Sequence, residues 1–294
     1  MIKLVKKSFL FLMILVVIFT MTSCGDDIQI YTENGRSYLN FGRYPQTVVS
    51  DEKLIKKLEK ITETNSLGYI EYKGEEYKRQ VADRLNSKSI FQNGDEVVDG
   101  KTYYFKVEPI KWRVLETENG SYKLLSECVL DTQQFYASLY ETIIMSPNSY
   151  KYSNIRAWLN GYNGTSYGVE DFTNKGFIDI AFTEEEKAII KTTLVEKNTN
   201  DRIYLLSVEE AINTIYGFDS NQYAKDSARE AKATDYAIAR FCSIDEGKGL
   251  WWLRSPDEDS HGFVRVVDVN GSARILSSVE CRDGVRAVLE IEIK

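Results

Sequence analysis

Hydrophobic and polar positions along the chain follow two periods, one typical of helices and one typical of strands. Helical patterns cover 51–64, 153–160 and 234–241, and two more begin at the capping residues Thr183 and Ser207. Strand patterns cover 69–81 (as a pair), 102–107, 111–116, 122–127, 201–206, 250–254, 262–269, 273–276 and 285–293. Asn119-Gly120 is a strong hairpin signal between two of them. Because strands and helices come in blocks rather than in strict alternation, we expect an α+β fold with an antiparallel sheet.

The first residues have the pattern of a secretory signal peptide. Lys3, Lys6 and Lys7 precede an apolar run over 9–19. As a helix this run would span about 16 Å, too short for a bilayer core of ~30 Å. Small residues then precede Cys24, and the string Met-Thr-Ser-Cys resembles the lipobox of bacterial lipoproteins, whose cysteine is acylated.

We therefore expect a signal peptide over 1–23 and a lipid such as palmitate on Cys24. An ordinary secreted protein is the alternative. Residues 24–36 are polar and short, which predicts a tether between lipid and domain. No second linker follows and the chain has four prolines, so 37–294 is expected to be a single domain. The protein would then be exported and anchored to the cell membrane, facing outside the cytoplasm.

Charge and composition exclude several function classes. A net charge of −7 argues against nucleic-acid binding, which needs a basic face. With one histidine, His261, neither a histidine-rich metal site nor a typical catalytic triad is expected. No phosphate-binding, dinucleotide-binding or nucleophile-elbow motif occurs, so we predict no cofactor and no catalytic residues. Cys128, Cys242 and Cys281 are expected to be small buried residues, although one disulfide remains possible.

Several strings resemble a bacterial family known as domain of unknown function 6273, frequent in exported proteins. They lie, in the family's order, at 41–46, 103–115, 152–160, 181–183, 201–211, 251–256 and 284–289. One departure is Ala287, where the family pattern has proline. The resemblance covers about 37–294.

The closing part of the chain has a weaker resemblance to C-type-lectin-like domains and to the related formylglycine-generating-enzyme fold. This resemblance implies a twisted antiparallel sheet flanked by short helices, with loops that face a ligand. The calcium-binding triplets of lectins and the catalytic cysteine pair of the formylglycine enzymes have no counterpart here. Neither activity is therefore expected.

The segment after the Trp-rich strand supplies the candidate ligand-binding residues. Trp251 and Trp252 should point to opposite strand faces, so that one is core and Trp252 can stack on a ligand, unless both are core. Arg254 and Arg286 could clamp an anion or form structural ion pairs. The following loop adds the residues Asp257, Asp259, His261 and Arg265. Its carboxylates could bind Ca²⁺, although acidic runs are usually solvated turns.

We favour a lipid-anchored, non-enzymatic module that binds a glycan or a protein at the cell surface and contacts the membrane through its anchor. A structural or assembly lipoprotein of the envelope is the first alternative. A hydrolase acting through two carboxylates is the second, since the 44 acidic residues allow many pairs.

Overall fold

The computed structural model describes residues 28–84, 89–137 and 146–293. The expected signal peptide, Cys24 and the first residues of the tether lie outside this part of the chain. Within it, no helix is long and apolar enough to cross a membrane. Residues 31–33, which the sequence assigns to the tether, form strand β1 (Tyr31–Glu33) and pair with the start of β2 (Arg36–Val48).

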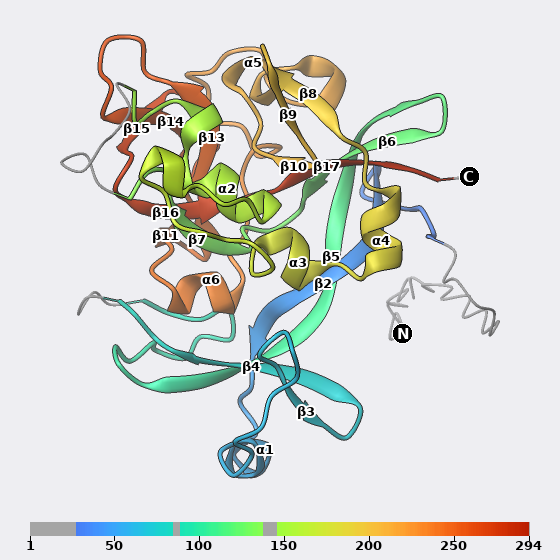
Figure 1. Ribbon diagram of the computed structural model, residues 1–294, viewed down its shortest axis with the longest axis vertical. Helices are drawn as coiled ribbons and strands as arrows, with labels where there is room; N and C mark the ends of the chain where they lie inside the picture. Colours follow the sequence, from blue (N-terminus) through green and yellow to red (C-terminus); the bar gives the residue numbers. More distant parts are fainter. Residues whose placement is uncertain (1–27, 85–88, 138–145, 294) are drawn as a thin grey trace, which may run out of the picture.

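The larger sheet runs through the middle of the molecule and contains both the first and the last strand of the described chain (Figure 1). Its further strands are β3 (Ile70–Tyr72), β4 (Glu75–Val81), β5 (Thr102–Glu118), β6 (Ser121–Ser126), β10 (Ile203–Tyr204) and β17 (Val288–Glu292). The order is β1-β2-β5-β6-β17-β10. Strand β4 pairs with the first part of β5 on one side and with β3 on the other. All of these pairings are antiparallel.

Strand β5 corrects a sequence expectation, because the two strands predicted at 102–107 and 111–116 are one strand of 17 residues. Pro109 suggests a break between them, since proline cannot donate to a ladder. In the fold, β4 pairs with β5 as far as Lys106, and β6 pairs with it from Trp112 onward. Pro109 therefore lies between these two partners and pairs with β2 alone, opposite Arg43. The expected hairpin forms at Asn119-Gly120, where both residues have positive φ.

The smaller sheet has the order β15-β14-β13-β16-β7. Its strands are β7 (Asp131–Gln134), β13 (Trp251–Pro256), β14 (Phe263–Val267), β15 (Ile275–Ser278) and β16 (Arg282–Val285). Strands β13 and β16 are parallel and the other neighbours are antiparallel. Two separate hairpins complete the strands: β8 (Thr193–Glu196) with β9 (Thr199–Asp201), and β11 (Ile244–Asp245) with β12 (Lys248–Gly249). The predicted α+β class with mostly antiparallel sheets is confirmed.

The helices are short, and side-chain caps define where most of them begin. They are α1 (Glu52–Leu58), α2 (Asn154–Asn160), α3 (Phe177–Ala181), α4 (Glu184–Ile189), α5 (Val208–Ala211) and α6 (Asp235–Ala239). Single 3-10 turns lie at Tyr150–Tyr152, Thr165–Tyr167 and Thr214–Tyr216. Ser153 and Thr234 cap α2 and α6, while Thr183 and Ser207 form reciprocal capping boxes with Glu186 and Glu210.

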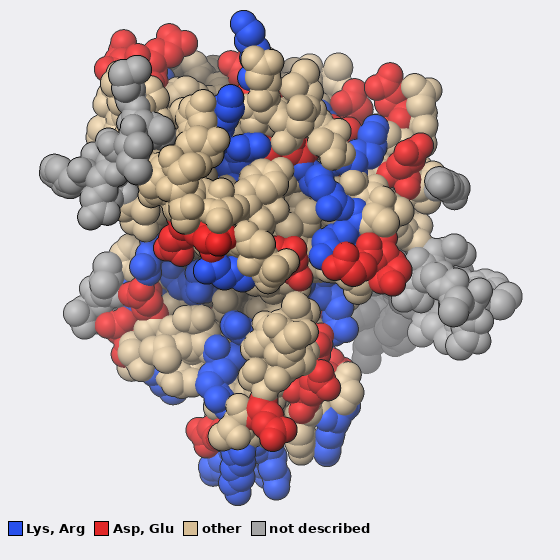
Figure 2. Space-filling model, in the orientation of Figure 1, with Lys and Arg blue, Asp and Glu red and all other residues tan. Residues whose placement is uncertain are grey.

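A large hydrophobic core extends from Leu39 to Ile291 and holds all four tryptophans. A smaller cluster lies under α1, where Leu58 packs on Ile70, Tyr77 and Tyr104. This helix is shorter than the predicted 51–64 and lies with β3 and β4 at one end of the molecule, where Lys and Arg gather on the surface (Figures 1 and 2).

The three cysteines within the described residues are unpaired. Cys242 is buried as expected and Cys128 is partly buried. Cys281 is exposed, against expectation, because it lies in the turn that leads into β16.

Candidate functional site

Strand β13 does not present a tryptophan to a ligand. Trp251 and Trp252 are both 0% exposed. The Trp252 indole donates to the Gln133 carbonyl over 2.8 Å, and its ring lies 5.5 Å from the ring of Phe135. Since β13 is an inner strand whose two faces are both covered, alternation sends the two side chains into two parts of the core. The expectation that Trp252 stacks on a ligand is therefore wrong.

Arg254 and Arg286 are structural cations rather than an anion clamp. The Arg254 guanidinium donates to the Leu205 carbonyl over 2.6 Å and to the Glu210 carboxylate. Arg286 is fully buried, lies 4.9 Å from the Trp251 ring centroid and donates to the Ser126 carbonyl. Burial lowers the pKa of Arg286 to about 9. Both groups are engaged by the fold, so neither is available to an anionic ligand.

The loop between β13 and β14 is held by its own contacts. Asp257 forms an ion pair with Arg265 at 3.4 Å, while Asp259 and His261 are exposed. The Asn148 amide donates to three carbonyls of the loop, those of Asp257, Ser260 and Phe263. Across the described ranges, no three His, Cys, Asp or Glu side chains gather as a set of metal ligands. The predicted site residues thus lie in one region, and none of them lines the cavities described below.

A cavity of about 320 Å³ lies between the start of α2 and the loop that follows this helix. Three tyrosines line it: Tyr152, Tyr162 and Tyr167. The rings of Tyr152 and Tyr167 are 4.8 Å apart, and Tyr162 and Tyr167 are 36% and 38% exposed. Lys151 and Asn163 add polar groups to the lining. We call this site the tyrosine pocket.

A buried ion pair between Arg156 and Asp201 holds Tyr162, one of the three pocket tyrosines, in place. Arg156 donates to both oxygens of Asp201, at 2.7–2.9 Å, and its guanidinium lies 5.0 Å from the ring centroid of Tyr162. The Tyr162 hydroxyl donates to the same carboxylate over 3.3 Å. Burial raises the pKa of Tyr162 to about 12 and also raises the pKa of Asp201, against the pull of Arg156. The Tyr162 hydroxyl therefore keeps its proton, and its hydrogen bond to Asp201, to a higher pH than an exposed tyrosine would.

The loop that carries Tyr167 is also fixed from the core. The Tyr136 hydroxyl donates to the Tyr167 carbonyl over 2.5 Å. In a local turn, the Asn163 side-chain oxygen accepts a hydrogen bond from the Thr165 backbone N–H. The pocket walls are thus preformed, which limits the ordering entropy that a ligand must overcome. Sequence reasoning missed this site. The signal that could have found it is three tyrosines within a short Gly- and Asn-rich stretch.

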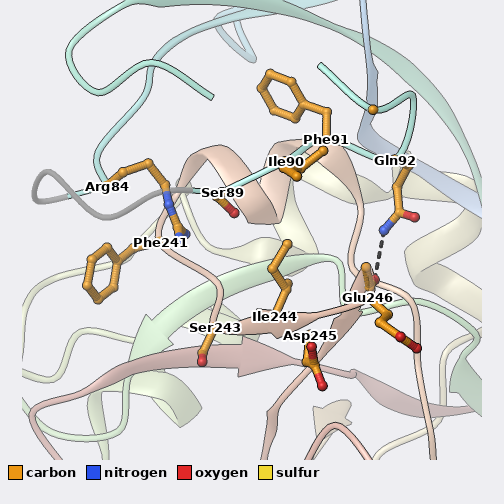
Figure 3. Close-up of a pocket in the computed structure, with 12 residues that line it drawn as sticks. Arg84, Ser89, Ile90, Phe91, Gln92, Phe241, Ser243, Ile244, Asp245 and Glu246 are labelled. Carbon is orange, nitrogen blue, oxygen red and sulfur yellow. Dashed lines mark hydrogen bonds between the residues drawn. The ribbon is translucent and has the colours of Figure 1, made fainter. Parts of the chain in front are cut away.

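A larger cavity of about 690 Å³ lies between the segment Arg84–Gly94 and the turn around β11 (Figure 3). Gln92 donates through its side-chain amide to the carbonyls of Ala233 and Gly247, and one of these bonds is drawn in Figure 3. Arg84 donates to the Ile238 and Cys242 carbonyls. These polar side chains hold the two loops together. Residues 85–88, which connect Arg84 with Ser89, lie outside the described chain.

One buried carboxyl group outside these cavities, that of Asp283, has an oxygen without a hydrogen-bond partner among the described residues. Asp283, on β16, is 8% exposed, and its Oδ2 has no hydrogen-bond partner among the described residues. Burial raises the pKa of Asp283 to about 6, although a hydrogen bond from Ser277 acts in the opposite direction. The folded state therefore binds this proton more tightly than the unfolded chain.

The Asp283→Asn variant is expected to be more stable than the natural protein at pH 7, by on the order of 2 kcal/mol. In the natural protein the folded pKa exceeds the unfolded one, so the contribution of Asp283 to stability falls as pH rises from about 4 to about 6. Urea unfolding at pH 4.5 and pH 7 measures the difference. Asp245→Asn, at an exposed position, is the control; equal behaviour of both variants would contradict the prediction.

Comparison with known protein families identifies a match to most of the C-terminal part of the chain. The family described as "Domain of unknown function (DUF6273)" matches residues 119–293, a segment that contains the whole tyrosine pocket. No curated protein and no solved structure matches the chain.

Proposed function

Since this chain belongs to the DUF6273 family, whose description names no activity, we propose its function from the chemistry of its cavities. We propose that it is an exported, lipid-anchored protein that binds a carbohydrate at the cell surface without transforming it. The tyrosine pocket is the observation that carries this proposal.

Aromatic rings beside polar groups suit a sugar. A pyranose ring has a face of C–H bonds that packs on the negative face of an aromatic ring, while its hydroxyls need hydrogen-bond partners. Tyr162 and Tyr167 offer exposed ring surface, and Lys151 and Asn163 offer polar groups around it. Most cavities that bind small molecules combine an apolar lining with few polar groups in this way.

The anchor and the scaffold complete the proposal. The basic start, apolar run and Cys24 support export and acylation, which would hold the domain at the membrane surface. The smaller sheet, with its tryptophan strand and short flanking helices, supports a C-type-lectin-like arrangement as the scaffold. In this proposal the ligand binds away from β13, beside α2.

The double variant Tyr162→Ala/Tyr167→Ala is expected to lose affinity for the bound glycan by about tenfold or more, because two exposed ring faces are removed. A glycan array identifies the ligand, and titration calorimetry measures the dissociation constants. Tyr223→Ala, which removes a 60% exposed ring elsewhere, is the matched control and should bind normally. An array without any bound glycan, or unchanged affinity in the double variant, would overturn the proposal. Selective binding to peptides would do the same.

A further inference from the structure

A third cavity, of about 230 Å³, lies between the end of β4, strand β7, the start of α2 and the end of α6. Its lining is polar and includes four residues with side-chain amides, Gln80, Gln133, Gln134 and Asn154, so we call it the amide cavity. The amides of Gln80 and Gln134 donate to the carbonyls of Val81 and Glu280. The Gln133 amide makes no hydrogen bond to any described residue, and it is partly exposed. Asn154 is only 5% exposed, yet its Oδ1 has no partner within the described chain.

A buried amide oxygen without a partner, beside a partly exposed amide, favours a ligand with hydroxyl groups. Each amide offers one acceptor oxygen and two N–H donors, and a sugar hydroxyl both donates and accepts. Leaving the buried Asn154 oxygen unsatisfied is unfavourable, so a ligand that donates to it gains affinity at this point. These groups match a polyhydroxylated ligand better than an apolar one.

Both arginines that line the amide cavity are already paired with carboxylates. Arg240 binds Asp131 at 2.6 Å, and Arg282 forms an ion pair with Asp83. Glu170 adds one further negative charge to the lining. In Figure 2, positive and negative side chains lie side by side in the band between the parts of the molecule that carry α2 and β4 in Figure 1. An anionic ligand would have to break an ion pair here, so the cavity suits a neutral one.

The amide cavity adjoins the tyrosine pocket. Ser153 lines the pocket and the next residue, Asn154, lines the amide cavity. Likewise, Val169 lines the tyrosine pocket and the next residue, Glu170, lines the amide cavity. At two points of the chain, consecutive residues thus line different cavities, which places the two cavities beside each other. We take this as the basis for a ligand with one sugar unit in each site.

We propose that the amide cavity is a second subsite, which binds a neutral, hydroxyl-rich sugar unit of the glycan whose neighbouring unit stacks on the tyrosines. This proposal rests on the function proposed above and extends it: the ligand class becomes a neutral oligosaccharide of at least two units. Gln133 and Asn154 determine the preference for length.

The test uses neutral oligosaccharides of hexose and N-acetylhexosamine, one to four units long, titrated against the full exported domain. The natural protein should bind the best disaccharide or trisaccharide about tenfold more tightly than its monosaccharide. Gln133→Ala should remove most of that gain and leave the monosaccharide affinity within about twofold. Gln222→Ala, outside both cavities, is the control. Asn154→Ala should act like Gln133→Ala, provided that its thermal unfolding shows an intact fold.

Equal affinity for all lengths would overturn the second subsite, and so would a Gln133→Ala variant that loses affinity equally for every length. Either outcome would leave the carbohydrate-binding function itself standing, because the protein would still bind a sugar. If no sugar of any length binds, or if the tyrosine double variant binds normally, the carbohydrate proposal itself fails.

Discussion

Replacing Arg229 by Met is expected to lower the free energy of unfolding by about 4 kcal/mol or more. The Arg229 side chain is fully buried and lies 3.4 Å from the Asp226 carboxylate. Its guanidinium donates to the carbonyl oxygens of five residues: Ala211, Asp219, Asn221, Ala224 and Gly271. Methionine fills similar space but donates to none of them, so several buried carbonyls and one carboxylate lose their partner.

Urea unfolding, followed by tryptophan fluorescence, measures this loss. Arg274→Met is the matched control, because Arg274 is exposed, and its effect should stay within about 0.5 kcal/mol. Arg229→Lys should also be strongly destabilising, since an ammonium group cannot reach carbonyls that a planar guanidinium spans. Unfolding of Arg229→Met at the same urea concentration as the natural protein would show that the carbonyls find other partners.

Replacing Trp252 by Ala is expected to lower the free energy of unfolding by about 3–5 kcal/mol. The indole is fully buried against Phe135, and its loss leaves a cavity as well as an unpaired Gln133 carbonyl. Trp252→Phe keeps most of the apolar volume but loses the hydrogen bond, so a smaller cost of about 1–2 kcal/mol is expected.

The same variant separates a core role from a ligand-binding one. Thermal and urea unfolding of Trp252→Ala are measured beside glycan affinity under conditions where the variant is folded. A core residue lowers stability and leaves the affinity of the folded fraction unchanged. Normal stability with lost glycan binding would instead restore Trp252 as a ligand residue.

Local features of the fold were predictable because they depend on neighbours in sequence. Thr183 with Glu186, and Ser207 with Glu210, form capping boxes three residues apart, and the hairpin at Asn119-Gly120 needs two adjacent residues. The continuity of β5 through Pro109 depends instead on where distant strands end beside it. The parallel pairing of β13 with β16 likewise has no local signal.

The candidate site was harder to predict, for a related reason. Alternation tells which face a strand residue occupies, but it does not tell whether the second face is covered, and so Trp252 was assigned to a ligand. Arg254 finds its partner Glu210 44 residues away in the chain. The tyrosine pocket forms because the loop carrying Tyr167 folds back onto Tyr152, a contact that depends on Tyr136 in the core.

The position of β5 has a consequence for the segment that matches the family. The matched segment starts at residue 119, directly after β5, and its first strand, β6, lies between β5 and β17. A gene fragment encoding the matched segment alone would leave one edge of β6 open and would lack Trp112, whose ring fills the core. In this chain the matched segment therefore depends on β5, a strand outside its bounds, to complete its sheet.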